Sequence, residues 1–235
     1  MKKKKDTDIK DTDIKTAKDD LAYNNKKKSV GREYAEAIVI ALLLALFIRA
    51  FIVQAFKIPS GSMENTLLVG DHILVSKFIY GIKIPNEIPF TQIKLFNDIR
   101  FFSHSPKRGD IIVFRYPMDK SRDFIKRVIG LPGEQLEIRG QEVYINGEPL
   151  KETHVIHNDP NPHIVHSLPR DYYGPVTIPE GSLFVMGDNR ENSRDSRYWG
   201  FLDIKEVKGK AFIIYWSWDK ERFGIRWDRF GKLLH

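Results

Sequence analysis

The sequence predicts an all-β domain that follows a single N-terminal transmembrane helix. Three observations predict this arrangement. A long apolar stretch occupies residues 37–56, short apolar or alternating runs separated by turn residues fill the rest of the chain, and no long soluble helix is evident among those runs. With 42% hydrophobic and 29% charged residues in a chain of 235, the composition is that of a globular protein.

The first 33 residues form a charged segment of low complexity. The sequence Asp6–Lys10 repeats directly as Asp11–Lys15, and lysine runs stand on both sides. Because so polar a segment cannot bury enough apolar surface to offset its chain entropy, we expect residues 1–33 to form a solvated cytoplasmic tail. This tail carries 11 Lys and Arg against 7 Asp and Glu, so the rest of the chain holds only +3 of the formal charge of +7. Such a balance argues against nucleic acid as a partner.

The apolar stretch begins at Ala37, is interrupted by Arg49 and ends at Phe56. As a helix, its 20 residues would be about 30 Å long, which matches the core of a bilayer. A cleaved signal peptide and a buried core helix are the alternatives. The long charged lead, the lack of an A-x-A-like site after Ile48 and the continuity of the run favour an uncleaved anchor over residues 34–56.

The charge on either side of this anchor predicts its orientation. Residues 17–36 contain five Lys and Arg, whereas residues 57–76 contain only Lys57. Because basic flanks stay in the cytoplasm, we expect a single-pass protein of the inner (plasma) membrane with a cytoplasmic N-terminus. Residues 57–235 then lie on the extracytoplasmic face.

Turn residues divide the remaining chain into short strands. The predicted strands are Ile73–Val75, Ile111–Phe114, Phe124–Ile129, Gln135–Ile138, Glu142–Ile145, Ser182–Met186 and Ala211–Trp216. Turns are predicted at Arg108–Asp110, Leu131–Gly133, Asn146–Gly147 and Gly187–Asn189. Residues 151–180 are rich in Pro, His and Asn, and we expect them to form a loop.

The chain has no cysteine, which excludes thiol catalysis, thiolate metal sites and disulfides. Two His-x-x-His pairs, His154/His157 and His163/His166, raise the alternative of a metal enzyme. In an extended segment, however, residues three apart point to opposite faces, and the sequence contains no HExxH helix. We therefore expect no metal and no cofactor.

Ser62 lies in the segment Ile58–Met63, which begins two residues after the apolar stretch. Pro59 and Gly61 impose irregular backbone there, and such backbone exposes a serine hydroxyl. A plain turn at the exit from a membrane has the same composition. This segment alone therefore leaves open whether the serine is catalytic.

Lys126 stands inside the apolar run Asp123–Gly133, where alternation places it on the same face as Phe124 and Val128. Desolvation on that face would lower the pKa of the lysine amine, and a neutral amine can act as a general base. The alternative is an edge-strand lysine whose amine stays in water. Arg127 cannot take the same role, because a guanidinium group stays charged.

Two further segments are strongly polar. Gly187–Arg197 is dense in side chains that form charge-assisted hydrogen bonds, which can hold a loop rigid and orient a neighbouring catalytic group. A hairpin loop with solvated charges is the alternative. We interpret Arg108–Asp110 as a tight turn that leads into a buried strand rather than as an adhesion motif.

In their order and content these segments resemble the signature blocks of the bacterial type I signal peptidases, over roughly residues 50–202. The matching blocks are Ser60-Gly61-Ser62-Met63, Arg108-Gly109-Asp110, Lys126-Arg127 before Gly130-Leu131-Pro132-Gly133, and Gly187-Asp188-Asn189-Arg190 followed by Asn192-Ser193 and Asp195-Ser196-Arg197. The chain departs from the family at Asn65, where Pro is frequent, and at Glu191, where Asp is frequent. Both departures bear on local backbone rather than on the assignment.

The resemblance implies a role for each matching residue. Ser62 is the expected nucleophile, Lys126 the general base, Ser60 the hydroxyl that joins the Ser62 N–H in the oxyanion hole, and Ser193 the residue that orients the lysine amine. The expected supporting residues are Asp188, Arg190, Asp195 and Arg197, with Asp195 and Arg197 as an ion pair. The residues expected to line shallow substrate pockets are Phe56, Ile58, Met63, Leu67, Phe124 and Ile125.

The same resemblance implies an antiparallel catalytic sheet formed by residues 57–131 and 184–235, with a smaller β region inserted over about residues 132–183. It also implies a membrane-anchored serine endopeptidase that removes signal peptides after small residues at positions −1 and −3. The expected partners are exported preproteins, membrane lipid and a nearby secretion translocon. A dedicated maturation peptidase with the same Ser–Lys dyad and a non-catalytic membrane-anchored β scaffold are the alternatives.

Overall fold

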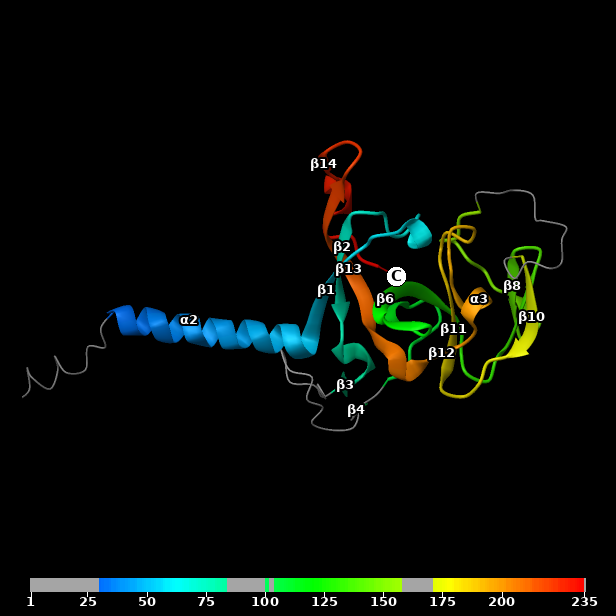
Figure 1. Ribbon diagram of the computed structural model, residues 1–235, viewed down its shortest axis with the longest axis horizontal. Coiled ribbons are helices and arrows are strands. Elements are labelled where there is room, and N and C mark those ends of the chain that lie inside the picture. Colours follow the sequence, from blue (N-terminus) through cyan, green and yellow to red (C-terminus); the bar gives the residue numbers. More distant parts are fainter. Residues whose placement is uncertain (1–29, 84–99, 102–103, 158–170, 235) are drawn as a thin grey trace, which may run out of the picture. The chain divides into compact units, whose positions relative to one another are not determined.

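The computed structural model describes residues 30–83, 100–101, 104–157 and 171–234 (Figure 1). They fall into two units, Met1–Ile48 and Arg49–His235. Most of the predicted charged tail, as well as His163 and His166, lies outside the described residues.

Helix α2 (Val30–Phe47) makes up most of the described part of the first unit. Its Ala- and Leu-rich sequence favours a helix, and Arg32 and Glu36 form an i,i+4 ion pair of 3.1 Å on it. None of its side chains is buried, and apolar residues such as Ile38 and Leu43 are more than 60% exposed. No helix in the described ranges has both the length and the apolar composition required to cross a membrane.

The predicted helix over residues 37–56 is wrong at its C-terminal end. After α2 ends, a π-helical turn covers Ile48–Ile52, and strand β1 (Val53–Lys57) begins. β1 pairs antiparallel with β2 (Asp71–Ser76), and Phe56 packs against the core. Pairing with a neighbouring strand decides the structure here against the predicted helix, because β-branched and aromatic residues suit a half-buried strand as well as they suit a helix.

The larger sheet is antiparallel at every strand pair and has the order β1-β2-β13-β5-β6-β11-β12, with β14 added beside β13. Its further strands are β5 (Ile111–Tyr116), β6 (Asp119–Gly130), β11 (Ser182–Met186), β12 (Leu202–Asp203), β13 (Val207–Asp219) and β14 (Gly224–Ile225). All predicted strands of this part of the chain are confirmed. The two longest, β6 and β13, bring together segments that are far apart in the sequence.

A smaller antiparallel sheet has the order β10-β7-β8-β9. It consists of β7 (Gln135–Arg139), β8 (Glu142–Ile145), β9 (Glu148–Pro149) and β10 (Tyr172–Thr177). The prediction of loop over residues 151–180 is wrong for β10, whose Pro175 is tolerated because the strand lies at the sheet edge beside a register shift. A separate pair joins β3 (Ile82–Lys83) to β4 (Arg100–Phe101).

Turn chemistry follows the sequence at the predicted positions. Asn146 and Gly147 have φ angles of 52° and 85°, as a two-residue hairpin turn requires, and they connect β8 to β9. Within the described ranges, the helices that follow the π-helical turn are short: α3 (Ser196–Trp199) and four 3-10 turns, at Gly61–Met63, Phe78–Tyr80, Ile204–Glu206 and Trp227–Arg229.

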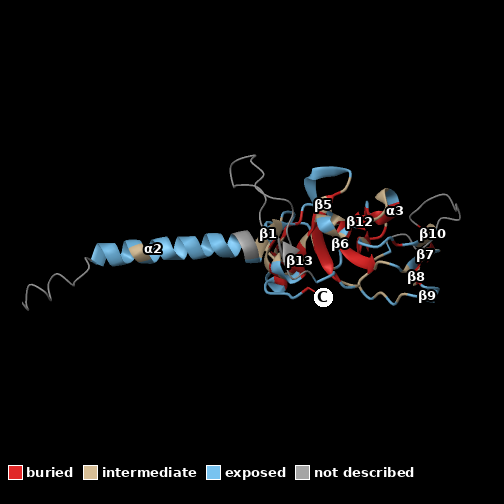
Figure 2. Cartoon of the chain, turned by 90° about the horizontal axis from the view of Figure 1, so that it is seen from below, coloured by how far each residue is buried: buried red, intermediate tan, exposed pale blue. Residues whose placement is uncertain are grey.

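Buried residues, red in Figure 2, lie mainly in the sheets of the second unit. Two clusters pack on the larger sheet, one around Ile73 and Ile214 and the other around Phe114 and Val185. A third cluster joins Leu136 of β7 to residues of β11, so the two sheets share apolar contacts through β11. The segment that follows β11 is therefore fixed between the two sheets.

Candidate active site

Ser62 lies in the 3-10 turn Gly61–Met63, directly after β1. The turn is anchored from below by Met63 and Leu67, whose side chains are fully buried, and the N–H of Leu67 donates to the Met63 carbonyl at 2.7 Å. Ser60, in extended backbone two residues earlier, is exposed. The fold thus holds Ser62 in a rigid turn, with 8% of the residue exposed.

Lys126 lies in β6 opposite Ile112 of β5, and only 3% of it is exposed. Its Nζ is 2.6 Å from the Ser62 Oγ and 3.0 Å from the Ile125 carbonyl oxygen. The predicted nucleophile and base are therefore within hydrogen-bond distance of each other, although 64 positions separate them.

Burial lowers the pKa of Lys126 to about 8, against the opposing effect of the nearby Asp195 and Asp188 carboxylates; the Arg197 charge adds to the lowering. Desolvation dominates because an ammonium group loses its hydration inside the protein. A substantial fraction of the amine is therefore neutral at mildly alkaline pH and able to accept a proton.

A cleft of about 1020 Å³ opens beside these two groups. Its lining combines polar and apolar side chains: Pro59, Ser60, Ser62, Tyr116, Arg122, Asp123, Phe124, Ile125, Lys126, Glu191, Asn192, Ser193, Arg194 and Tyr198. The edge of β6 borders this cleft, because β11 pairs with β6 only from Arg127 onward. An extended peptide could add to such an edge by main-chain hydrogen bonds.

The predicted pocket residues divide into two groups. Phe124 and Ile125 line the cleft. The other four belong to the hydrophobic core beneath the Ser62 turn and do not line it: Phe56, Ile58, Met63 and Leu67. These positions anchor the turn that carries Ser62, and burial of 98% or more leaves Ile58, Met63 and Leu67 no surface for a substrate.

Asp195 and Arg197 form the expected ion pair. The Arg197 Nε and Nη2 donate to the two Asp195 carboxylate oxygens at 2.8 and 2.9 Å, and both side chains are almost completely buried. Burial alone would raise the pKa of Asp195, but the Arg197 charge and hydrogen bonds keep that pKa below its ordinary value. The pair also ties the loop together, since Arg197 donates to the Arg190 carbonyl and Asp195 accepts from the Gly187 N–H.

Asp188 connects the nucleophile segment to the lysine strand. The Arg127 Nε and Nη2 donate to its two carboxylate oxygens at 2.9 and 2.8 Å, and the Thr66 hydroxyl donates at 2.5 Å. Arg127 neighbours Lys126, and Thr66 lies four residues after Ser62. The sequence signal for Arg127 was its position in an apolar strand, because a buried guanidinium requires a carboxylate partner.

The loop after β11 also reaches the backbone of the nucleophile. The Asn189 N–H donates to the Ser62 carbonyl at 3.2 Å. At Gly187, a Cβ atom would lie 2.4 Å from that same carbonyl oxygen, so only glycine permits the close approach. Arg190 turns away from the cleft and pairs with Glu152 at 2.5 Å, a partner that the sequence did not indicate.

Ser193 lines the cleft, and its buried hydroxyl acts on the Asp195 carboxylate, whose pKa it helps to lower. The expected contact with the Lys126 amine is not formed here. Among the described residues, no three His, Asp or Glu side chains are grouped to hold a metal ion.

Comparison with known proteins places these features in a family. The family described as "Signal peptidase, peptidase S26" matches residues 31–216. A signal peptidase I from Pseudomonas aeruginosa is 37% identical over 216 residues, which cover 79% of this chain and 72% of that protein. A signal peptidase I from Leptolyngbya laminosa is 37% identical over 204 residues, with 83% and 84% of the two chains covered. The family match includes every segment that lines the cleft.

A crystal structure of a signal peptidase I from Enterococcus faecalis is 38% identical and covers 46% of this chain and 97% of that chain, with a TM-score of 0.38. The membership of the family rests on the sequence matches.

Proposed function

The chain belongs to the signal peptidase family, peptidase S26, and is a serine peptidase, and on that premise we propose that it removes N-terminal signal peptides from exported preproteins with Ser62 as nucleophile and Lys126 as general base. One observation carries the assignment of the pair. The buried Lys126 amine lies 2.6 Å from the Ser62 hydroxyl, beside the cleft.

The reaction begins when neutral Lys126 accepts the Ser62 proton as the Oγ attacks the scissile carbonyl carbon. The resulting lysine ammonium then donates that proton to the leaving amine, and the C–N bond breaks. The neutral amine then deprotonates a water molecule, whose oxygen attacks the acyl carbon. The ester C–Oγ bond breaks, and the lysine ammonium returns the proton to Oγ, which restores the serine hydroxyl. The pKa of about 8 supports this cycle, because the amine can both accept and return a proton near neutral pH.

The negative charge that develops on the carbonyl oxygen requires hydrogen-bond donors. We assign this role to the Ser60 hydroxyl and the Ser62 N–H. Ser60 supports the assignment because it is exposed and lines the same cleft as Ser62. One such donor contributes about 3–4 kcal/mol to transition-state stabilisation.

The supporting residues Asp188, Arg190, Asp195 and Arg197 position the pair rather than touch the substrate. Their buried ion pairs fix the loop that meets the Ser62 carbonyl and the strand that carries Lys126. We assign Ser193, which lines the same cleft as Lys126, to orientation of the lysine amine.

Phe124 and Ile125 support the choice of small residues at positions −1 and −3. They lie next to Lys126 on the part of β6 that borders the cleft, and an extended peptide points alternate side chains toward one wall. We propose that the Phe124 and Ile125 side chains restrict the substrate positions nearest the reacting carbonyl to small residues.

Attachment to the membrane is the remaining part of the proposal. In α2 the apolar side chains from Ile38 to Phe47 are exposed, and so large an apolar surface is unfavourable in water. We propose that this stretch holds the chain at the inner membrane, with the N-terminus cytoplasmic and residues 57–235 outside, near the translocon. Exposed Trp227 and Phe230 are candidates for lipid contact by the second unit.

The proposed function is tested with purified wild type, Ser62→Ala and Lys126→Ala in detergent, acting on a model preprotein with Ala at −1 and −3. We expect cleavage by wild type and background rates for both variants. A Lys126→Ala variant that kept most of the activity would show that another group is the base. If wild type left this substrate and a panel of other preproteins intact, a dedicated maturation peptidase would become the better assignment.

A further inference from the structure

The segment Glu152–His157 lies across the loop that follows β11 and forms a short strap. Its main chain donates one hydrogen bond to that loop and accepts one from it. The Ile156 N–H donates to the Asp188 carbonyl at 2.9 Å, and the Arg190 N–H donates to the Ile156 carbonyl at 3.3 Å. The strap therefore holds Asp188 and its neighbours from the side opposite to the Ser62 turn, whose carbonyl accepts from Asn189.

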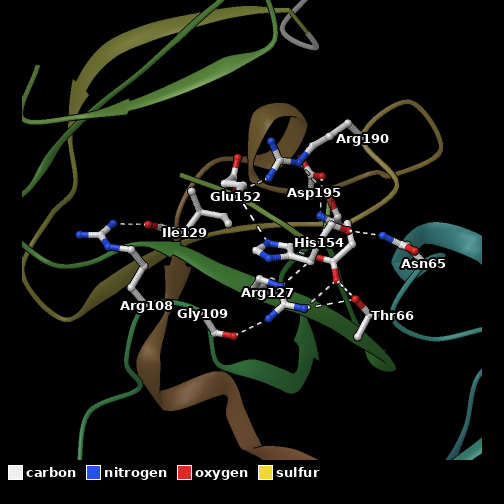
Figure 3. A network of polar contacts seen from close by, with 12 residues as sticks. Asn65, Thr66, Arg108, Gly109, Arg127, Ile129, Glu152, His154, Arg190 and Asp195 are labelled. Atoms are coloured by element: carbon white, nitrogen blue, oxygen red, sulfur yellow. Dashed lines mark hydrogen bonds and ion pairs between the residues drawn. The ribbon is translucent and has the colours of Figure 1, made fainter. Parts of the chain in front are cut away.

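Side chains extend the strap to both neighbouring segments. The Asn65 amide, three residues after Ser62, donates to the His154 carbonyl at 3.1 Å. Glu152 pairs with Arg190 at 2.5 Å, and His157 Nδ1 lies 3.2 Å from Glu191. Strap, loop and nucleophile turn are thus tied into one unit, part of which is drawn in Figure 3.

The imidazole of His154 lies in the middle of this unit (Figure 3). Its Nε2 is 3.7 Å from Asp188 Oδ1 and 3.8 Å from Glu152 Oε1, and this buried nitrogen makes no hydrogen bond to any described residue. The Nε2 therefore lies beside the Asp188 carboxylate, which joins Arg127 to Thr66, but outside hydrogen-bond range of it.

The charges around His154 are balanced while the ring is neutral. The groups that face it are the Asp188 and Glu152 carboxylates and the Arg127 and Arg190 guanidinium groups. Each carboxylate is already paired with one of the two arginines. A proton on the imidazole would add a third positive charge beside two carboxylates that are already paired, and the imidazolium would compete with Arg127 for Asp188.

The ionisation of His154 agrees with this geometry. Burial lowers the pKa of the imidazole, Arg127 lowers it further, and the two carboxylates compensate only in part. Because the folded protein holds this proton more weakly than the unfolded chain does, acid destabilises the strap. The contribution of neutral His154 to the stability of the fold is complete above about pH 6.5, the ordinary pKa of histidine, and decreases as the pH falls below that value.

We propose that Glu152–His157 is a strap that positions the Ser62 and Lys126 segments through Asp188, and that His154 is its positioning residue, which loosens the strap when it takes up a proton. Neither the strap nor His154 lines the cleft, so the effect is on the alignment of the reacting groups and not on substrate affinity. Since misalignment by a fraction of an ångström slows a reaction without weakening binding, kcat is the affected constant. The kinetic part of this inference rests on the proposed function, whereas its effect on stability does not.

The test compares wild type with His154→Gln, which cannot be protonated, and His154→Ala, which removes the contact. His104→Gln is the matched control, because His104 is exposed and lies outside the cleft and the strap. Three quantities are measured between about pH 5 and pH 9: kcat and KM for the model preprotein, and the midpoint of thermal unfolding.

At pH 8.5 we expect His154→Ala to lower kcat about tenfold with an unchanged KM, while His154→Gln keeps most of the rate. Below about pH 6.5, the wild type and His104→Gln should lose thermal stability more steeply than His154→Gln. The inference would be overturned if His154→Ala had the same kcat as wild type. It would also be overturned if wild type and His154→Gln lost the same amount of thermal stability in acid. If no variant cleaves, the unfolding curves still decide it, so failure of the proposed function and failure of the strap are distinguishable.

Discussion

Lys126 and Arg127 are adjacent basic residues in the same apolar strand, but the surroundings of their side-chain charges differ. Lys126 has no carboxylate within ion-pair distance among the described residues, so burial lowers its pKa to about 8. Arg127 makes two charge-assisted hydrogen bonds to Asp188. The difference follows from their chemistry, because an amine can give up its proton when buried whereas a guanidinium group must be paired.

The pair of Arg127 and Asp188 gives a prediction at the residue scale. Asp188→Asn leaves a buried guanidinium charge without compensation, so we expect the free energy of unfolding at pH 7.5 to fall by about 3 kcal/mol, with loss of preprotein cleavage. Urea denaturation of wild type and variant measures the change.

The matched control for Asp188→Asn is Glu137→Gln, which removes the carboxylate of the exposed pair with Arg139. We expect the stability of this control to equal that of wild type within error, because surface pairs are screened by water. Equal stability of Asp188→Asn and Glu137→Gln would contradict the supporting role given to the buried pair.

The residues that could be predicted from the sequence are those with a local signal. Lys126 was identifiable because a cation in an alternating apolar strand is conspicuous, and the order of blocks around it resembles a known family. Thr66 and Glu152 carry no such signal, since their importance depends on partners 122 and 38 positions away. Those partners are set by the topology of the sheet.

At the scale of elements, the short strands were predicted well and the ends of the apolar stretch were not. Strands such as β5 and β8 are bounded by turn residues and show their period locally. Residues 53–57 have no turn signal before them, so their apolar character fits a continued helix as well as it fits β1. Only pairing with β2 decides between the two, and pairing is a long-range interaction.

Long-range pairing also decides the structure of β10, where a strand forms in a segment whose sequence favours a loop. Its sequence Tyr172–Thr177 contains Gly174 and Pro175, which are typical of loops. The strand exists because Tyr173 and Val176 pair with Ile138 and Leu136 of β7 on either side of a register shift. Edge position is what permits the proline, and a sequence without its neighbours does not reveal which strand lies at an edge.

Attachment to the membrane by helix α2 gives a prediction at this scale. Leu43→Lys puts a charge in the middle of its exposed apolar surface, which costs about 2.5–3.5 kcal/mol in a bilayer. We expect at least a tenfold lower binding of the full chain to phospholipid vesicles, measured by flotation, with preprotein cleavage in detergent unchanged.

Met118→Lys is the matched control for Leu43→Lys, because Met118 is also an exposed apolar residue but lies between β5 and β6. It should float with the vesicles as wild type does. Identical flotation of Leu43→Lys and wild type would rule out α2 as the attachment, and a loss with Met118→Lys would assign the lipid contact to the second unit.

For the whole molecule, the site is assembled from segments that the chain order separates. The Ser62 turn follows β1, Lys126 lies in β6, and the loop after β11 supports both, while the strap comes from the chain between β9 and β10 of the smaller sheet. The smaller sheet shares a hydrophobic cluster with β11, and the chain between its strands forms hydrogen bonds to the loop after β11. The family resemblance pointed to Ser62 and Lys126 as a pair, and the order of the sheet explains why the two residues lie together.

If buried, neutral Lys126 activates Ser62, the rate of cleavage must depend on the ionisation of Lys126. We expect a rate that increases about tenfold per pH unit at low pH and becomes constant above an apparent pKa of about 8. Single-turnover cleavage of the model preprotein between about pH 6 and pH 10 gives this profile free of product release. A flat profile, or a rate that still increases toward about 10.4 as for a solvated lysine, would contradict the account.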